Sequence, residues 1–266
     1  MDQADAGEGI LVREDKAGAV YLTLNRPAKF NTLSDAMLGE LQRELDAIAV
    51  DPAVRCVVIG ARGRGFCAGH DLREMRANPD PAYYQALFRR CSRVMQSIVA
   101  LPVPVIASVQ GMATAAGCQL VASCDLAIAA RSARFAVSGI NVGLFCSTPA
   151  VALSRSLPAK RAFDMLVSGE FMAAQTAFEL GLLSAVVEDA ELEAAVANKV
   201  AQILDKSPAA VRFGKSMFHP QRRMALAEAY EFAGAVMADN MMHADAGEGV
   251  DAFLAKRQPV WQQPGH

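Results

Sequence analysis

Short apolar runs recur along the first two-thirds of the chain and alternate with amphipathic stretches. AVYLTL (19–24) has a period of two, and residues 10–24 together predict a β-hairpin. RCVVIGA (55–61) is apolar almost throughout, which is typical of a strand buried on both faces. Similar runs predict further strands at 103–109, 125–130 and 134–139.

Helical periodicity separates and then follows these strands. Leucine and isoleucine recur every three or four residues over 35–49, and Ser34 is a suitable N-cap for that helix. A second long helix is predicted over 81–100. From Thr148 on the pattern is helical throughout, which predicts an α/β core followed by a helical region. The helices expected there cover 148–157, 159–168, 173–181, 189–205, 208–218 and 222–244.

Composition narrows the function classes. The 266 residues are 53% apolar and carry a net charge of −2, which argues against nucleic acid or an anionic membrane as the main partner. No apolar run approaches the roughly 18 residues of a membrane span. The acidic start MDQADAGEGI has no signal-peptide character, so we expect a cytoplasmic location. The histidines have no ligand spacing, so we expect no metal site.

Two glycine-rich loops each follow a predicted strand. They are GRGFCAGHDL (63–72) and GMATAAGCQ (111–119), and the second leads into a predicted helix start. Two such loops side by side can direct two backbone N–H groups at one carbonyl oxygen, which is the geometry of an oxyanion hole. Gln119 is the polar side chain of that first helical turn, and its amide neither accepts nor releases a proton at neutral pH.

Long motifs throughout the chain resemble the enoyl-CoA hydratase/isomerase, or crotonase, superfamily. The resemblance runs in order from about residue 10 to 260. Within the superfamily, TAAGCQLVASCD (114–125) and NVGLFCSTP (141–149) are most similar to the enoyl-CoA hydratase domain-containing proteins. The other motifs that carry the resemblance are LNRPAKFNTLS (24–34), GFCAGHDL (65–72) and SGEFMAAQTAFELGLLSAVV (168–187).

The resemblance implies a fold, a ligand and an assembly. The fold is a crotonase (ClpP-like) spiral of ββα units, here residues 1–200, with a C-terminal helical trimerisation region at 201–266. The ligand is a coenzyme A thioester, processed without a metal or redox cofactor. The assembly is a homotrimer or a dimer of trimers, consistent with the many apolar side chains predicted on the helix 222–244.

The resemblance also assigns roles to residues of this sequence. The backbone N–H groups that bind the thioester oxygen fall on His70 and Ala116. Arg64 matches a lysine that faces the CoA phosphates, and Phe253 and Lys256 match residues that reach the CoA of a neighbouring chain. The CoA-binding positions expected in full are Ala28, Lys29, Phe30, Arg64, Ala68, Asp71, Leu72, Phe253 and Lys256.

The chain departs from the family where hydratases carry two glutamates that activate water. These positions hold Gln119 and Gly139, and neither supplies a titratable group. We therefore expect weak or absent hydration of ordinary enoyl-CoA. Asp71 and Glu74 are the nearest carboxylates, and the family's Asp in this loop is usually structural.

Three functions remain open from the sequence. The first is an enzyme that stabilises a thioester enolate, with Gln119 as a positioning residue and Gly139 at the position of the missing acid. The second is an acyl-CoA decarboxylase or hydrolase that uses the imidazole of His70, because similar Gly-His-Asp loops occur in family decarboxylases; no spacing supports a Ser–His pair. The third is a non-catalytic acyl-CoA binding or regulatory protein that has lost its acids.

Overall fold

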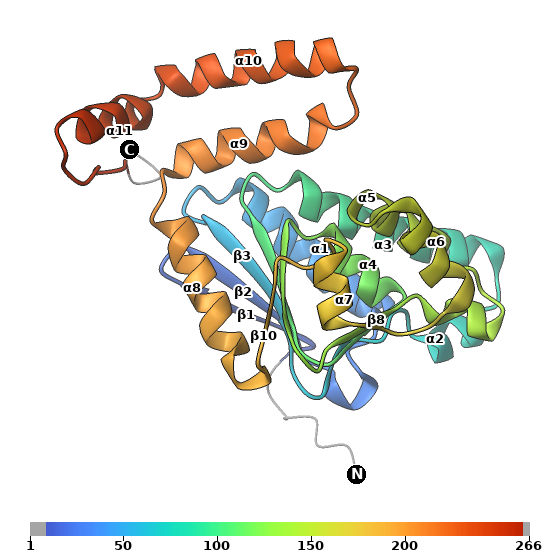
Figure 1. Ribbon diagram of the computed structural model, residues 1–266. Coiled ribbons are helices and arrows are strands. Elements are labelled where there is room, and N and C mark those ends of the chain that lie inside the picture. Colours follow the sequence, from blue (N-terminus) through green and yellow to red (C-terminus); the bar gives the residue numbers. More distant parts are fainter. Residues whose placement is uncertain (1–8, 263–266) are drawn as a thin grey trace.

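The computed structural model describes residues 9–262, and Figure 1 shows an α/β core with a helical arm. In this part of the chain a six-stranded sheet has the order β1-β2-β3-β5-β7-β10, and a four-stranded sheet has the order β4-β6-β8-β9. The strands of the larger sheet are β1 (Leu11–Lys16), β2 (Ala19–Leu24), β3 (Cys56–Ala61), β5 (Val105–Val109), β7 (Leu126–Ala130) and β10 (Ala185–Val187). Those of the smaller sheet are β4 (Gly65–Cys67), β6 (Met112–Thr114), β8 (Arg134–Ala136) and β9 (Met172–Ala173).

From β3 to β8, consecutive strands join the two sheets in alternation. β3, β5 and β7 pair in parallel in the larger sheet, and the strand after each one, β4, β6 or β8, joins the smaller sheet in parallel. Helices follow β4, β6 and β8, so the chain repeats a ββα unit. The predicted crotonase-type spiral is confirmed.

Burial on both faces explains the apolar character of β3. Val57 and Ile59 lie in the main core, whereas Cys56 and Val58 pack in a second cluster beneath α8 (Leu192–Leu204). Figure 1 shows α8 on the outer face of the larger sheet. The prediction of a fully buried strand at 55–61 is therefore confirmed.

Most predicted helices are present. Ser34 caps α1 by accepting a hydrogen bond from the Met37 N–H, as expected. The helices of the core are α1 (Asp35–Val50), α2 (Leu72–Ala77), α3 (Pro81–Ala100), α4 (Ala116–Ser123), α5 (Ser147–Ser156), α6 (Ala159–Ser168), α7 (Ala174–Glu179) and α8, with 3₁₀ turns η1 (Pro27–Lys29), η2 (Ser138–Val142) and η3 (Asp189–Glu191). The C-terminal helices are α9 (Pro208–Gln221), α10 (Leu226–Met242) and α11 (Ala244–Leu254).

The end of the chain differs from the prediction. A single helix was expected over 222–244, but residues 222–225 form a turn and His243 ends α10 in an extended conformation. The Nδ1 atom of His243 accepts a hydrogen bond from the Asp245 N–H, so the same residue caps α11. A helix break at a histidine leaves little trace in the hydrophobic pattern.

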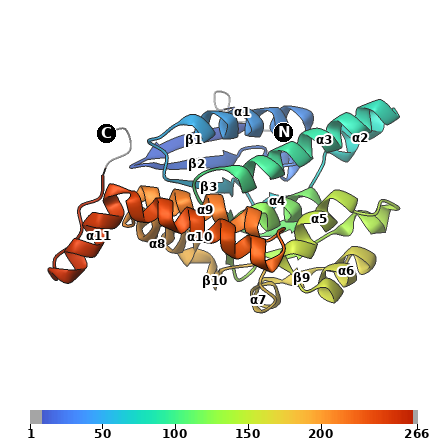
Figure 2. The ribbon, with the colours of Figure 1, turned by 90° about the horizontal axis from the view of Figure 1, so that it is seen from above.

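The helices α9, α10 and α11 project from the core as an arm (Figures 1 and 2). No residue of α10 is buried in the single chain, and Leu226, Tyr230 and Met237 are each at least 70% exposed. The proposed division between residues 200 and 201 lies inside α8, which packs on the core sheet.

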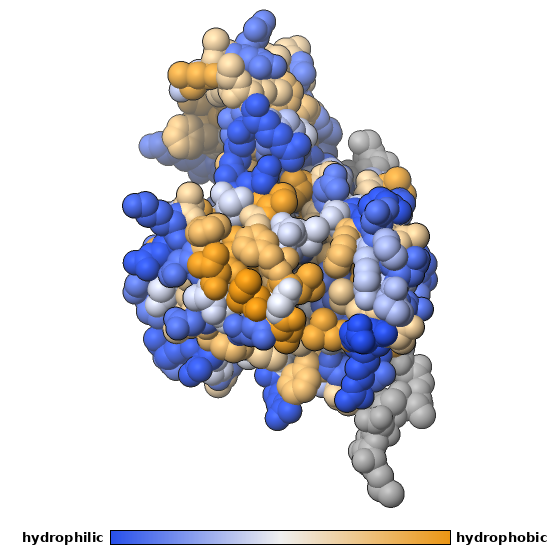
Figure 3. Space-filling view, turned by 90° about the vertical axis from the view of Figure 1, so that its right-hand side faces the viewer, coloured by the Kyte–Doolittle hydropathy of each residue, from blue (hydrophilic) through white to orange (hydrophobic). Residues whose placement is uncertain are grey.

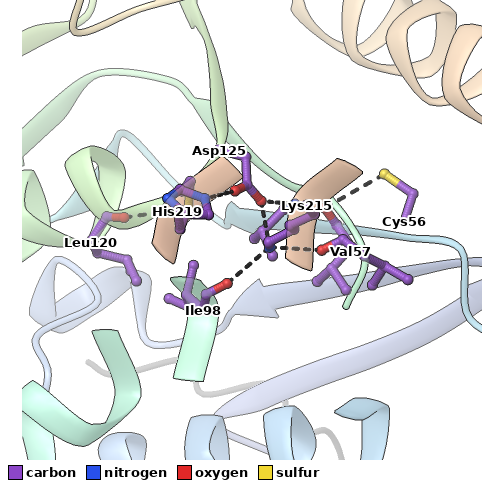
Figure 4. A network of polar contacts seen from close by, with 10 residues as sticks. Cys56, Val57, Ile98, Leu120, Asp125, Lys215 and His219 are labelled. Carbon is purple, nitrogen blue, oxygen red and sulfur yellow. Dashed lines mark hydrogen bonds and ion pairs between the residues drawn. The ribbon is translucent and has the colours of Figure 1, made fainter. Parts of the chain in front are cut away.

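A buried charge network fastens α9 to the core (Figure 4). Asp125, directly before β7, accepts a hydrogen bond from the Nζ of Lys215 at 2.6 Å and lies 2.7 Å from the Nε2 of His219. The Lys215 ammonium also donates to the carbonyls of Ile98 and Val103, so its three donors are satisfied. The network thus links the helical arm to the segments just before β5 and β7.

Within residues 9–262 no helix has both the length and the apolar character needed to cross a membrane.

Candidate functional site

The two glycine-rich loops touch. A Cβ on Gly117 would lie 2.2 Å from the carbonyl oxygen of Cys67, and a Cβ on Gly69 would lie 3.2 Å from the Ala116 nitrogen. Neither position tolerates a side chain without movement, which explains why both are glycine. The loop after β4 is therefore packed directly against the first turn of α4.

Ala115 adopts an unusual backbone conformation at this junction. Its φ of 50° is positive, which costs an alanine roughly 1–3 kcal/mol, and such strain is frequent at functional sites. The conformation is held from both sides, because the Ala115 N–H donates to Ala136 and its carbonyl accepts from Gln119. No side chain caps the start of α4. The first N–H groups of α4 are thus left for another partner.

Two backbone donors meet where the loops touch. The His70 N–H and the Ala116 N–H make no hydrogen bond with any part of the chain that the structure describes. The residue before His70 is fixed, because the carbonyl of Gly69 accepts a hydrogen bond from the Leu33 N–H at 2.8 Å. The start of α4 adds positive potential to this place. Two free donors beside a helix N-terminus can stabilise a negative oxygen.

Gln119 lies one helical turn beyond Ala116, on the same side of α4. The residue is 4% exposed, and its Oε1 atom is buried without a hydrogen-bond partner among residues 9–262. An unpaired buried acceptor is costly, so this amide oxygen is ready to accept from a ligand or a water. The sequence predicted a residue that binds rather than titrates, and no comparison tests that role.

Gly139 lies in η2, in a crowded position. A Cβ there would be 2.5 Å from the Leu144 carbonyl oxygen and 2.7 Å from the Sγ of Cys146. Real side chains do not approach this closely, so a larger residue requires the segment 139–146 to move. The sequence identified Gly139 as the place of a missing acid, but it could not reveal that the space for one is absent.

The imidazole of His70 is not a free base. Its ring packs edge-on against Phe88 of α3 at 5.5 Å between centroids, and its Nε2 atom is buried without a partner in the described residues. Burial lowers the pKa of His70 to about 4, although the charge of Asp35 acts in the opposite direction. At neutral pH the ring is therefore uncharged and only weakly basic.

The nearby carboxylates are occupied by helix caps. Asp71 accepts hydrogen bonds from the N–H groups of Arg73 and Glu74 at the start of α2. Glu74 in turn accepts from the Asp35 N–H at the start of α1. Both carboxylates support backbone conformation, which agrees with the structural role expected for Asp71.

All of the residues expected to bind CoA except Phe253 and Lys256 lie on or beside the first glycine-rich loop, residues 63–72. The guanidinium of Arg64 lies 4.6 Å from the ring centroid of Phe30, and the Ala68 N–H donates to the Phe30 carbonyl. Ala28 and Lys29 are exposed in the turn η1, and Leu72 at the start of α2 is 52% exposed.

Asn31 is a residue that sequence reasoning missed. It is fully buried, and its side-chain amide donates to the carbonyls of Arg62 and Gly65 while its oxygen accepts from the Arg26 N–H. Asn31 therefore joins the turn 26–31 to the loop that carries Arg64. Its positive φ of 53° next to Phe30, also positive, is typical of a turn whose residues are fixed by contacts. An asparagine inside an Arg-Pro turn motif was the available signal.

Phe253 and Lys256 are not brought to the site within one chain. Phe253 is 81% exposed on α11, and Lys256 is exposed just after this helix, in the projecting arm (Figure 1). If they contact CoA, it is the CoA of another copy.

Apolar surface lies beside the segment that carries Gly139. Figure 3 shows apolar side chains gathered on the face of the molecule where α5 and α6 lie. Exposed apolar residues of η2, the following loop and α6 are Val142, Leu144, Phe145, Phe163 and Val167, which are 41% to 66% exposed. Such a surface suits an acyl chain or another protein chain.

No group of three or more His, Cys, Asp and Glu side chains in the described part of the chain is placed to hold a metal ion.

The spiral of ββα units and the paired backbone donors define a class of protein, the α/β proteins of the crotonase fold. The family model described as enoyl-CoA hydratase/isomerase matches residues 14–264, and the chain belongs to this family.

Known proteins are similar to this chain over nearly its whole length. A crystal structure of an enoyl-CoA hydratase from Mycobacterium smegmatis is 55% identical, with a TM-score of 0.94 over 96% of this chain and 99% of that one. Human enoyl-CoA hydratase domain-containing protein 3, mitochondrial, is 45% identical over 92% of this chain and 80% of that protein. The 2,3-dehydroadipyl-CoA hydratase of Escherichia coli is 36% identical over 90% of this chain and 93% of that protein. The resemblance to the domain-containing proteins is therefore confirmed.

The expected cytoplasmic location is contradicted. The human protein and its Xenopus laevis counterpart, which is 42% identical, are both named mitochondrial. The expectation rested on the composition of the first ten residues, of which 1–8 lie outside the described residues. The composition of ten residues does not determine the compartment of a protein, so this inference had little physical basis.

Proposed function

We propose that this chain binds coenzyme A thioesters and holds the thioester oxygen between the N–H groups of His70 and Ala116. The observation that carries the proposal is that two unpaired backbone donors meet where the loops touch, at the start of α4. An enolate formed from the thioester would place its negative charge on the same oxygen. The relative named as a 2,3-dehydroadipyl-CoA hydratase supports this ligand class.

The proposed reaction is enolate stabilisation rather than ordinary hydration. Gln119 positions the substrate, Gly139 leaves no acid on the opposite side, and Asp71 and Glu74 are engaged as caps. The version that uses His70 as a base is less well supported, because a buried imidazole with a pKa near 4 is a weak base. No metal or redox cofactor is part of the proposal.

The proposed CoA site lies along the first glycine-rich loop, residues 63–72. Backbone atoms of residues 28–30 would contact the adenine, and the guanidinium of Arg64 would pair with phosphate oxygens. Ala68, Asp71 and Leu72 would border the path to the thioester. In a trimer or a dimer of trimers, Phe253 and Lys256 would reach the CoA of a neighbouring copy.

A second candidate function is acyl-CoA binding without turnover. The occupied carboxylates and the buried neutral His70 favour it, because the described site offers no ready acid or base. Turnover of any thioester in a broad panel distinguishes the two functions.

The test of the proposed oxygen site compares two ligands by calorimetric titration. Butanoyl-CoA has the thioester carbonyl, whereas S-butyl-CoA is a thioether without it. We expect the thioester to bind about 10-fold more tightly, because two N–H donors are left unpaired by the thioether. Gly69→Ala should reduce this difference, since its Cβ would press on Ala115 and Ala116. Equal binding of both ligands by the unaltered protein would refute the oxygen site.

A further inference from the structure

A groove between α9 and the core is lined by more positive than negative side chains. Helices α3, α4 and α5 and the segments that precede β5 and β7 form its walls on the core side, and α8 and α9 form the remainder. Among the described residues that line the groove, Asp125 is the one carboxylate, and Lys215 and His219 already bind it. A cleft lined by one sign of charge attracts ligands of the opposite sign, so the groove favours an anion. The cationic side chains that line it are those of Arg155, Lys199, Lys206, Lys215, Arg222 and Arg223.

Three arginines of this groove form a cluster that has no carboxylate partner among residues 9–262. Arg222 donates from its Nη2 atom to the Arg155 carbonyl at 2.9 Å, which brings the turn after α9 against the last turn of α5. Arg223 follows in the same turn, and all three arginines are exposed. Lys206 and Lys215, by contrast, are each paired with an aspartate. Guanidinium groups match the two oxygens of a carboxylate, so the arginine cluster is suited to such an anion.

The groove also reaches the proposed thioester site. Gln119 of α4 and Thr148 of α5 line it together with the arginine cluster. Val121 and Val151 add apolar surface to the walls that the same two helices form. One ligand can therefore place an apolar chain along α4 and α5 and an anionic end at the arginines.

Two features set the length of chain that connects the thioester with the arginine cluster. At 1.5 Å per residue, α4 rises about 9 Å from Ala116 to Ala122. The Ala122 carbonyl accepts a hydrogen bond from the Ser156 hydroxyl at 3.2 Å, and Ser156 directly follows Arg155. Successive atoms of an extended chain with bonds of about 1.5 Å advance by roughly 1.3 Å, so about eight carbons cover this distance.

We infer that the preferred substrates are acyl-CoA thioesters whose acyl chain ends in a carboxylate, and that Arg155, Arg222 and Arg223 bind this terminal carboxylate. The inference rests on the proposed function, because the thioester oxygen must lie between the N–H groups of His70 and Ala116. A chain that ends in a methyl group leaves the three guanidinium groups without an anion. The substrate class is thus the mono-thioesters of dicarboxylic acids of about eight carbons.

Calorimetric titration with two matched ligands tests this preference. Suberoyl-CoA, the mono-thioester of octanedioic acid, and octanoyl-CoA have the same chain length, and one ends in a carboxylate where the other ends in a methyl group. We expect suberoyl-CoA to bind about 10-fold more tightly at low ionic strength, because its carboxylate makes charge-assisted hydrogen bonds. The difference should shrink as salt is added, since the arginines are exposed.

Two double variants separate the arginine cluster from the general charge of the groove. Arg155→Gln with Arg222→Gln should remove the preference for suberoyl-CoA and leave the affinity for octanoyl-CoA unchanged. Lys199→Gln with Lys206→Gln is the matched control, because it removes two positive charges from the same groove and leaves the cluster complete. The control should keep the preference. Circular dichroism and sedimentation of each variant establish that the fold and the assembly are retained.

The outcomes separate this inference from the proposed function. Equal affinity for suberoyl-CoA and octanoyl-CoA would overturn the inference and leave the proposed function intact. A preference that persists in the arginine double variant would likewise overturn it, because another group would then bind the carboxylate. A changed sedimentation mass of that variant with an unchanged preference would also overturn it and assign the arginines to a contact between copies. Failure of every thioester and of free CoA to bind would overturn the proposed function itself.

Discussion

By the resemblance to the family, Gln119 and Gly139 are expected at the positions where a hydratase carries its two carboxylates. Each missing acid or base costs about 10²–10⁴ in rate. We therefore expect hydration of crotonyl-CoA to be orders of magnitude slower than in a two-glutamate hydratase, measured by loss of the enoyl-thioester absorbance. The unaltered protein hydrating crotonyl-CoA at a rate typical of hydratases would show that another group supplies the proton transfer.

Introducing glutamate at both positions, 119 and 139, should produce little hydration of crotonyl-CoA. Gln119→Glu alone lacks a second carboxylate, and Gly139→Glu places a side chain 2.5 Å from the Leu144 carbonyl oxygen.

Gly139→Ala by itself should destabilise the fold by about 1–3 kcal/mol, since overpacking forces the backbone to shift. Urea unfolding measures this change, and Gly143→Ala, which has open space but a positive φ, reports the cost of backbone strain alone.

The lowered pKa of His70 predicts that the stability of the protein depends on pH. Its pKa is about 4 in the folded protein and 6.5 for an exposed histidine, so between these values the unfolded chain binds more protons. The contribution of His70 to the free energy of unfolding has its full value above pH 6.5 and falls as the pH is lowered toward 4. From pH 7 to pH 5 the loss from this group should be roughly 2 kcal/mol. His70→Phe, which keeps the backbone N–H, should lose that much less in urea unfolding, and an identical loss in both proteins would contradict the burial of the ring.

Arg64 tests the proposed phosphate contact. Arg64→Ala should weaken binding of CoA and its thioesters about 10- to 100-fold, because a charge-assisted hydrogen bond to an anion is lost. Arg161→Ala, an exposed arginine on α6, is the control and should bind CoA normally. Unchanged affinity in Arg64→Ala would mean that its guanidinium serves only the contact with Phe30.

At the scale of elements, the hydrophobic pattern predicts what is long and regular and misses what is short. The buried strand β3 and the capped helix α1 follow directly from period and N-cap chemistry. β4, β6 and β9 have three residues or fewer, which is too short for a period to appear. The paired N–H groups were predictable only as a possibility, because the contact between Gly69 and Ala116 depends on two distant loops. Likewise, nothing in the sequence indicates that Cys146 fills the space beside Gly139.

The network around Asp125 makes a prediction about how α9 is attached. Burial lowers the pKa of Lys215. Burial alone would raise the pKa of Asp125, but the hydrogen bonds that Asp125 accepts from His219 and Lys215 hold its pKa below the usual range. Lys215→Met removes the ammonium and leaves the buried carboxylate only partly compensated. We expect a loss of about 3 kcal/mol in urea unfolding.

Lys199→Met on α8 is the control for Lys215, because this lysine is only half-buried and its ammonium donates to the side chain of Gln202 at the surface. Its substitution should change stability by less than about 0.5 kcal/mol. Similar losses for both variants would show that the buried ion pair contributes nothing beyond an ordinary surface lysine.

At the scale of the whole molecule, the arm exposes apolar surface that a single chain leaves uncovered. α10 packs on α9 but has no buried residue, and Leu226, Tyr230, Met237 and Phe253 leave large apolar areas in water. Apolar area of this kind is stabilised when another protein surface covers it. Because the same arm carries Phe253 and Lys256 away from their own site, one assembly can both cover α10 and bring these residues to a neighbour's CoA.

We therefore expect a trimer or a dimer of trimers, with a sedimentation mass three or six times the 28.3-kDa chain. Replacing Leu226 and Met237 by glutamate should shift the protein toward smaller species, since both side chains are at least 70% exposed in the single chain. Exchange of the exposed Glu228 for glutamine is the control and should leave the assembly intact. If the assembly also completes the CoA site, Lys256→Ala should weaken CoA binding while the mass stays the same. A monomer at micromolar concentration would refute the assembly, and it would leave the exposed face of α10 for a different partner.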